Sequence, residues 1–205
     1  MTANPHAGGA RPPDLGKRRL IARFHRSQDG AAAIEFGIVA LPFLGLLLAI
    51  FELAMMFWTN EVLEESLSKA SRRLLTGEAA GRYVSSDPAV NAAAFRNDIC
   101  AETSMPMIDC SKLHVDVKVF SDFGSARNLG SPMNGGVLDT SGFGYVTPQP
   151  KQIAVVRAVL EYKLLFMGWA APELVNIGAD RRGLVASVAF RAEPYVAQPA
   201  GGSGT

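Results

Sequence analysis

The sequence D-G-A-A-A-I-E-F-G-I-V-A-L-P-F-L-G-L-L-L-A-I-F-E occupies residues 29–52 of the 205-residue chain. Its composition is that of a membrane-spanning segment, yet it carries a carboxylate, Glu35, close to its start. A charge near bilayer depth is costly, and such residues are usually paired or functional. The position of Glu35 therefore calls for a partner or a function.

The apolar run after Glu35 is long enough to cross a bilayer. From Phe36 to Trp58 there are 23 residues, and Glu52 is their single charge. A helix rising 1.5 Å per residue would be about 35 Å long, and a hydrocarbon core is about 30 Å thick. Trp58 suits the membrane–water interface. We expect a transmembrane helix over residues 31–60, with Glu52 near the outer headgroups.

The residues before this run are basic, which predicts the orientation of the helix. Residues 1–29 contain two acids, Asp14 and Asp29, and six basic residues: Arg11, Lys17, Arg18, Arg19, Arg23 and Arg26. Basic flanks stay in the cytoplasm, which places the C-terminal part outside. The alternative of a cleaved secretory signal is disfavoured, because its apolar core spans about 7–15 residues and ends at an A-x-A-like site. The basic flank also argues against a buried helix of a soluble protein.

Cleavage after Gly30 would provide the partner that Glu35 lacks. It would remove residues 1–30 and leave an α-amine on Ala31 that is largely protonated near neutral pH. The amine of one subunit could then pair with Glu35 of the next. A buried carboxylate left without its partner costs roughly 3–5 kcal/mol, by analogy with broken buried ion pairs. The alternative is that Gly30 only begins the helix and Glu35 reaches toward the headgroups.

This arrangement resembles the leader of type IV prepilins, with a basic head, Gly30 at the scissile position, Glu35 five residues later and a long apolar helix. Ordinary type IV pilins favour Phe as the first mature residue, whereas this chain has small residues at positions 31–33. The version G-A-A-A-I-E-F, ending at Phe36, is similar to the TadE/TadG-like pseudopilins of the tight-adherence (Flp pilus) system.

The resemblance is strongest over residues 25–75. Shorter stretches at 155–157 and 189–194 also look like features of the TadE branch. TadG proteins usually carry a much larger von Willebrand-like region, and this chain lacks their D-x-S-x-S metal motif. The TadE branch is therefore favoured.

The resemblance implies a non-enzymatic minor pilin or pseudopilin that a prepilin peptidase processes and that Flp pilus assembly requires. The implied partners are that peptidase, other pilin subunits, the Tad secretion machinery and inner-membrane lipid. The implied location is the bacterial inner membrane, crossed once, with a periplasmic C-terminal domain; entry into the pilus itself stays open. One alternative is an unprocessed, signal-anchored envelope protein with an extracytoplasmic interaction domain.

A membrane-anchored envelope enzyme is the other alternative, and the sequence gives it little support. No nucleophile–base set, metal motif or cofactor motif is evident, and His114 is expected to face solvent. The formal net charge of +1 gives no indication of a nucleic-acid partner.

Residues 61–196 are expected to form an exported, pilin-like α+β domain: a small antiparallel sheet packed on the amphipathic continuation of the long helix. An apolar face at helical spacing predicts that continuation, and it carries Leu63, Leu67, Ala70 and Leu74. Gly77 should end the helix. Asp87 and Pro88 predict the start of a short helix to about residue 100. We expect strands at residues 112–120, 152–164 and 183–193.

Two further segments and a cysteine pair complete the expectations. Residues 121–150 are rich in Gly, Ser, Pro and Asn and should form a long irregular loop. Residues 197–205 should be a disordered tail. Cys100 and Cys110 would be free thiols in the cytosol, but outside it they can close a loop worth roughly 2–3 kcal/mol.

Overall fold

The computed structural model of the chain describes residues 28–79, 81–103, 108–127, 129–168 and 171–194. It divides into two compact units, Met1–Leu47 (unit 1) and Leu48–Thr205 (unit 2), which are considered separately. The basic head expected before residue 28 and the tail expected over residues 197–205 lie outside the described residues.

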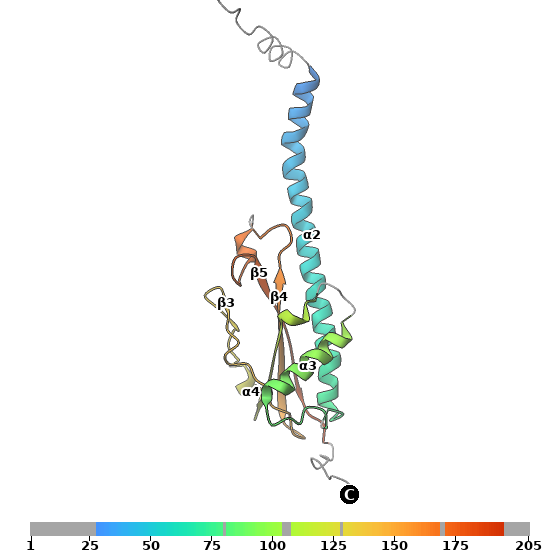
Figure 1. Ribbon diagram of the computed structural model, residues 1–205, viewed down its shortest axis with the longest axis vertical. Helices are drawn as coiled ribbons and strands as arrows, with labels where there is room; N and C mark the ends of the chain where they lie inside the picture. Colours follow the sequence, from blue (N-terminus) through green and yellow to red (C-terminus); the bar gives the residue numbers. More distant parts are fainter. Residues whose placement is uncertain (1–27, 80, 104–107, 128, 169–170, 195–205) are drawn as a thin grey trace, which may run out of the picture. The chain divides into compact units, whose positions relative to one another are not determined.

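One long helix, α2 (Gln28–Leu75), contributes to both units (Figure 1). The sequence-based expectation of a single helix from residue 31 to about residue 76 is confirmed. The helix ends just before Gly77, whose φ of 78° lies in the left-handed region. Glycine enters that region at little cost, because it has no Cβ to collide with the following carbonyl oxygen.

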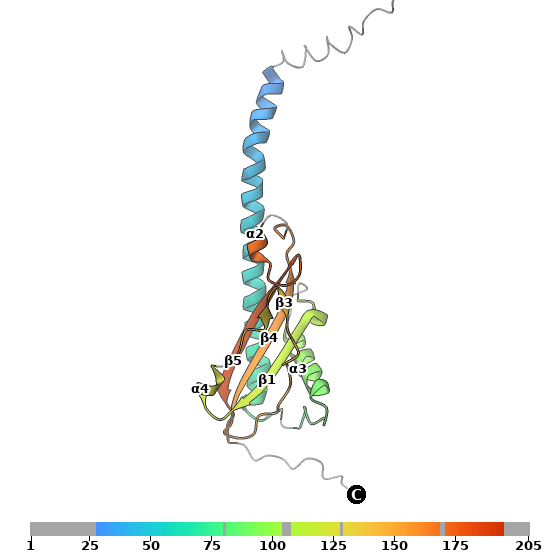
Figure 2. The same cartoon turned by 90° about the vertical axis from the view of Figure 1, so that its left-hand side faces the viewer.

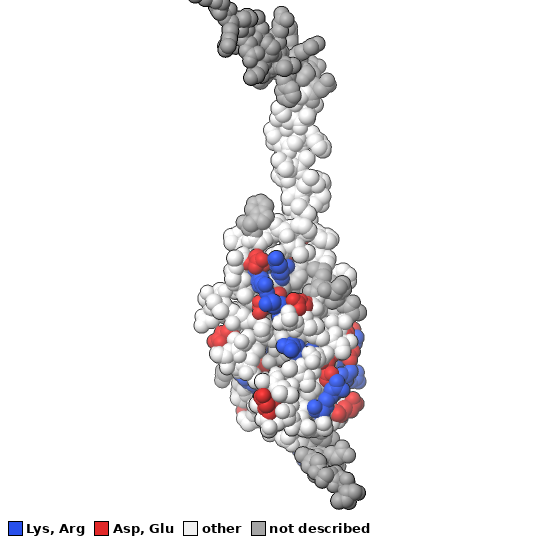
Figure 3. Space-filling view, viewed as in Figure 1, with Lys and Arg blue, Asp and Glu red and all other residues white. Residues whose placement is uncertain are grey.

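The described part of unit 1 is an apolar helix whose side chains are exposed. In Figure 3 it shows no coloured charged group on the face in view. Its large exposed apolar residues are Ile34, Phe36, Ile38, Val39, Leu41, Phe43, Leu44, Leu46 and Leu47. The helix from Gly30 to Leu75 is long and apolar enough to cross a membrane. These properties are those of a single-pass membrane anchor.

Unit 2 is built on a three-stranded antiparallel sheet. Its strands are β1 (Leu113–Phe120), β4 (Ile153–Lys163) and β5 (Arg181–Arg191), in the order β1–β4–β5. The central strand, β4, is buried along most of its length. All three strands match the sequence-based expectations to within two residues. The fold class is therefore α+β, as expected.

Two helices of unit 2 cover one face of this sheet (Figures 1 and 2). The predicted face of α2 is buried at all four positions: Leu63, Leu67, Ala70 and Leu74. The second helix, α3 (Pro88–Glu102), adds Phe95 and Ile99 to the same core. It begins as predicted, with Pro88 at the first position and the Asp87 side chain accepting a hydrogen bond from the Ala89 N–H.

The segment expected to be a loop, residues 121–150, covers the opposite face of the sheet. It is mostly irregular but contains the short helix α4 (Phe123–Ala126) and a hairpin of β2 (Met133–Asn134) and β3 (Val137–Leu138). Further on, residues 144–146 run beside β1. The Val117 N–H donates a hydrogen bond to the Gly144 carbonyl, and the Val117 carbonyl accepts one from the Val146 N–H. Two 3-10 turns complete the unit, η1 (Cys110–Lys112) and η2 (Pro172–Leu174).

Candidate processing and assembly site

The residues expected to form the processing site lie at the start of α2, in unit 1. Gly30 is the third residue of the helix and half-buried, whereas Ala31, Glu35 and Phe36 are exposed. The first turn of any helix lacks intrahelical acceptors for its N–H groups and frays easily. Glycine adds about 1 kcal/mol of destabilisation relative to alanine in a helix. The Gly30–Ala31 peptide bond lies in the first turn of α2, which both effects weaken.

Glu35 presents its carboxylate on the surface of unit 1. Among the described residues no hydrogen bond or ion pair of Glu35 is found. Nearby, Gly37 and Gly45 leave open space on the helix, because nothing apart from the adjacent residues and helix backbone lies within 4 Å of the position that a Cβ would take. Small residues on a helix surface let a second helix approach closely in lipid. This part of α2 thus offers an acid that has no partner among the described residues and two points of close approach.

Glu52 lies in unit 2 and differs from the expectation. It was expected near the outer headgroups, but its side chain is 0% exposed and therefore faces the interior of unit 2. Its Oε2 accepts hydrogen bonds from the backbone N–H groups of Leu165 at 2.9 Å and Phe166 at 2.6 Å. The Tyr162 hydroxyl lies 3.4 Å from Oε1. Burial, followed by the charge of Glu52 and the hydrogen bond to it, raises the pKa of Tyr162 to about 12.

A sequence signal for the burial of Glu52 exists but is easily missed. The buried face of α2 extends backward from Leu63 through Thr59 and Met56 to Glu52, at helical spacings of three or four residues. Position 52 therefore belongs to the stripe that packs on the sheet. The identity of its partners could not be foreseen, because they follow more than 100 residues later.

A second buried charge lies on the opposite face of the sheet. Asp116 lies on β1 and is 1% exposed. Its Oδ2 is 3.0 Å from Nη2 of Arg157 on the paired strand β4, and its Oδ1 accepts a hydrogen bond from the Gly144 N–H. Arg157 also donates to the Gly130 carbonyl and lies over the Phe143 ring. The 121–150 segment thus covers Asp116 and supplies part of its hydrogen bonding.

His114 lies on the same strand face as Asp116. Its Nε2 is 2.8 Å from Oε1 of Glu161, whose other oxygen accepts a hydrogen bond from Arg181 at 2.9 Å. Burial opposes ionisation of this carboxyl, but His114, Lys112 and Arg181 together lower the pKa of Glu161. Within the described residues, no group of three or more His, Cys, Asp or Glu is placed to hold a metal ion.

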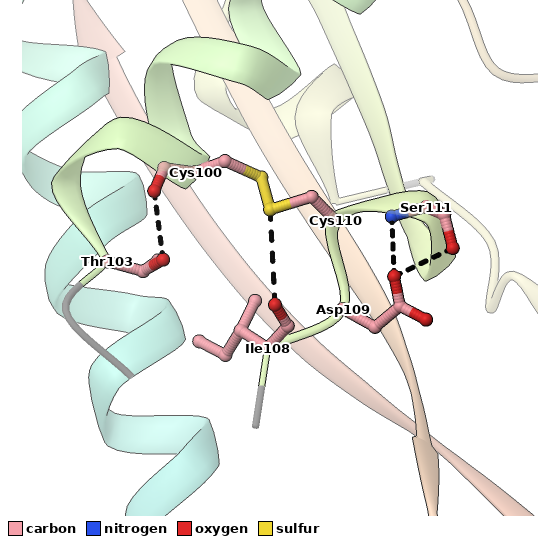
Figure 4. The surroundings of a disulfide bond; sticks show 6 residues. All are labelled: Cys100, Thr103, Ile108, Asp109, Cys110 and Ser111. Carbon is pink, nitrogen blue, oxygen red and sulfur yellow. Dashed lines mark hydrogen bonds between the residues drawn. A yellow bond between two sulfur atoms is a disulfide. The ribbon is translucent and has the colours of Figure 1, made fainter. Parts of the chain in front are cut away.

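The structure contains the expected disulfide between Cys100 and Cys110 (Figure 4). Cys100 lies near the end of α3 and Cys110 begins η1, immediately before β1. Asp109 caps η1, since its Oδ1 accepts hydrogen bonds from the N–H and hydroxyl of Ser111. The bond therefore fixes the end of α3 to the start of the sheet.

Removing this bond should lower the stability of unit 2. Replacing Cys100 and Cys110 by alanine is expected to reduce the free energy of unfolding by roughly 2–3 kcal/mol, because a loop of this length is no longer closed in the unfolded chain. Denaturant unfolding with and without a reductant measures the loss. The reductant should destabilise the native chain but not the double variant. Free thiols that label without reductant in the membrane-extracted protein would contradict the bond.

The comparison with known families bears on the start of α2. Residues 30–72 match the model of a family described as TadE-like protein. The chain carries a TadE-like segment. This segment begins at Gly30, includes Glu35 and Glu52, and ends three residues before the end of α2. No curated protein and no solved structure matches the chain significantly. The match ends within α2, and most of unit 2 lies outside it.

Proposed function

We propose that this chain is a minor pilin or pseudopilin of the TadE type, cleaved after Gly30 by a prepilin peptidase and needed to assemble Flp pili. The observation that carries the proposal is the TadE-like match, which starts at Gly30. Residue 30 is also where the basic head gives way to an exposed apolar helix. The role is structural, and no enzymatic activity is proposed.

In this proposal Glu35 acts in subunit assembly. After cleavage, Ala31 would carry a positive amine about one helical turn from Glu35, since a turn contains 3.6 residues. Each subunit would then present one positive and one negative group at the same end of an apolar helix. Pairing the amine of one subunit with Glu35 of its neighbour would neutralise both charges in lipid. The open surfaces at Gly37 and Gly45 support close helix approach during that pairing.

The proposed location is the bacterial inner membrane, with the N-terminus cytoplasmic and unit 2 periplasmic. The basic residues before α2 support this orientation. The Cys100–Cys110 bond also supports it, because disulfides persist in the periplasm and are rare in the cytosol. The proposed partners are the prepilin peptidase, other pilin subunits and the Tad secretion machinery.

Processing can be tested directly. In cells with an active prepilin peptidase, the membrane-extracted protein is expected to begin at Ala31, because Gly30 has no side chain to obstruct the peptidase. N-terminal sequencing and intact mass measure this. Replacing Gly30 by leucine should block cleavage and leave the full-length chain. Replacing Gly45 by leucine, farther along the same apolar helix, should not block cleavage.

The second candidate, an unprocessed signal-anchored envelope protein, predicts the opposite result. An N-terminus at Met1 or Thr2 in peptidase-positive cells would contradict processing. If the prepilin peptidase performs the cleavage, the protein should be full length in a strain that lacks this peptidase. A shortened protein in that strain would indicate cleavage by an unrelated protease.

A further inference from the structure

An exposed apolar turn follows strand β4 directly. The sequence of residues 164–168 is L-L-F-M-G. Leu165 is 52% exposed and Phe166 is 40% exposed, although both backbones are fixed by hydrogen bonds. Two adjacent apolar side chains are therefore exposed on a backbone that hydrogen bonds fix in place. Exposed apolar surface of this kind marks contacts with membranes or other proteins.

The turn lies against α2 where that helix enters unit 2. The ring of Phe166 is 6.3 Å from the ring of Phe51, measured between centroids. Phe51 itself is half exposed, as are Leu48 and Ile50 just before it on the helix. The exposed apolar surface of the turn therefore continues onto exposed apolar residues of α2 within unit 2. This continuity favours lipid as the occupant.

The backbone hydrogen bonds of the turn also suit an apolar environment. In lipid, an N–H group without a partner costs several kcal/mol, so irregular backbone needs partners inside the protein. Glu52 supplies them for the N–H groups of Leu165 and Phe166. The N–H of Leu164 donates to the Asp180 carbonyl, and that of Ala171 donates to Met167. Water could satisfy these groups on a solvated turn, without the cost of burying a carboxylate.

Charged residues mark a polar boundary next to the turn. Lys163, the last residue of β4, has a side chain that is 68% exposed and 3.8 Å from Asp180. Arg181 pairs with Glu161 close by. Charged side chains gather over this end of β4 and β5 in Figure 3. A lysine at this position can hold its ammonium group among phosphate headgroups while its carbon chain lies on apolar surface.

We propose that the turn at residues 164–168 inserts the side chains of Leu165 and Phe166 into the interfacial layer of the bilayer that α2 spans. Unit 2 would then contact the membrane at two points, α2 and this turn. Glu52 links the two points, because it belongs to α2 and binds the backbone of the turn. The inference depends on α2 being a membrane anchor and not on cleavage or pilus assembly.

Depth-dependent quenching tests the proposal with the full chain. Phe166→Cys is labelled with an environment-sensitive fluorophore and reconstituted in vesicles of phosphatidylcholine and phosphatidylglycerol in equal parts. The native cysteines stay oxidised and unlabelled. The matched control is Val84→Cys, an exposed apolar position that follows the C-terminal end of α2. Spin-labelled lipid should quench the label at position 166 several-fold more than the label at position 84, and aqueous iodide should show the reverse order.

Two results would overturn the proposal. Equal quenching at both positions by lipid and by iodide would place the turn in water. A blue-shifted label at position 166 that spin-labelled lipid does not quench would place the turn against protein, such as a second copy of the chain. If Phe166→Cys fails to fold, which loss of protease resistance would reveal, Leu165→Cys carries the label, since that side chain is more exposed.

Discussion

Replacing Glu35 by glutamine is expected to leave a processed, membrane-resident protein that no longer supports pilus assembly. Glutamine keeps the size of the side chain but removes the charge that would pair with the amine of Ala31. The position also becomes cheaper to place in lipid, so insertion should not suffer. Gly30 is unchanged, and cleavage should be reduced less than by Gly30→Leu. Electron microscopy and sheared-pilin assays in a deletion strain measure assembly, and N-terminal sequencing measures processing.

The matched control is Glu61→Gln, which removes an acid from an exposed position of α2 in unit 2. It should assemble pili at the level of the native chain. Glu52 is unsuitable as a control, because it is buried and holds a backbone turn. If Glu35→Gln assembled pili normally, the assembly role would be assigned to the wrong acid.

Replacing Glu52 by glutamine should strongly destabilise unit 2. Hydrogen bonds to a charged group contribute about 1.5–3 kcal/mol each, and a buried donor left without a partner adds a desolvation cost. Glutamine offers one acceptor oxygen and turns an NH₂ group toward N–H groups that donate. We expect a loss of about 3 kcal/mol, which for a domain of this size corresponds to a Tm lower by roughly 6–12 °C.

Thermal unfolding of the full chain in detergent micelles, followed by near-ultraviolet circular dichroism, measures this loss. Glu61→Gln should change stability by less than about 0.5 kcal/mol, since it is a surface substitution. A Glu52→Gln protein as stable as Glu61→Gln would show that the carboxylate does not hold the 164–168 turn. It would also remove one support for the lipid contact of that turn.

The elements of this protein could be predicted from sequence because their signals are local. The apolar run and the stripe from Leu63 to Leu74 define α2, and the pair Asp87–Pro88 defines the start of α3. Strict alternation of apolar and polar residues from residue 113 onward defines β1. Each signal arises from the geometry of neighbouring residues on one helix or strand, so it is present before the chain folds. The cysteine pair is local in the same sense.

The sequence by itself therefore determined the long helix and the α+β class. Only the tertiary structure decided the environments of Glu52 and Asp116. The donors to Glu52 lie 113 and 114 residues away, and Arg157 lies 41 residues from Asp116. A carboxylate looks the same in a sequence whether water or buried N–H groups solvate it. Whether water or buried N–H groups surround the carboxylate depends on the segments that cover that side of its helix or strand. These segments come from distant parts of the chain.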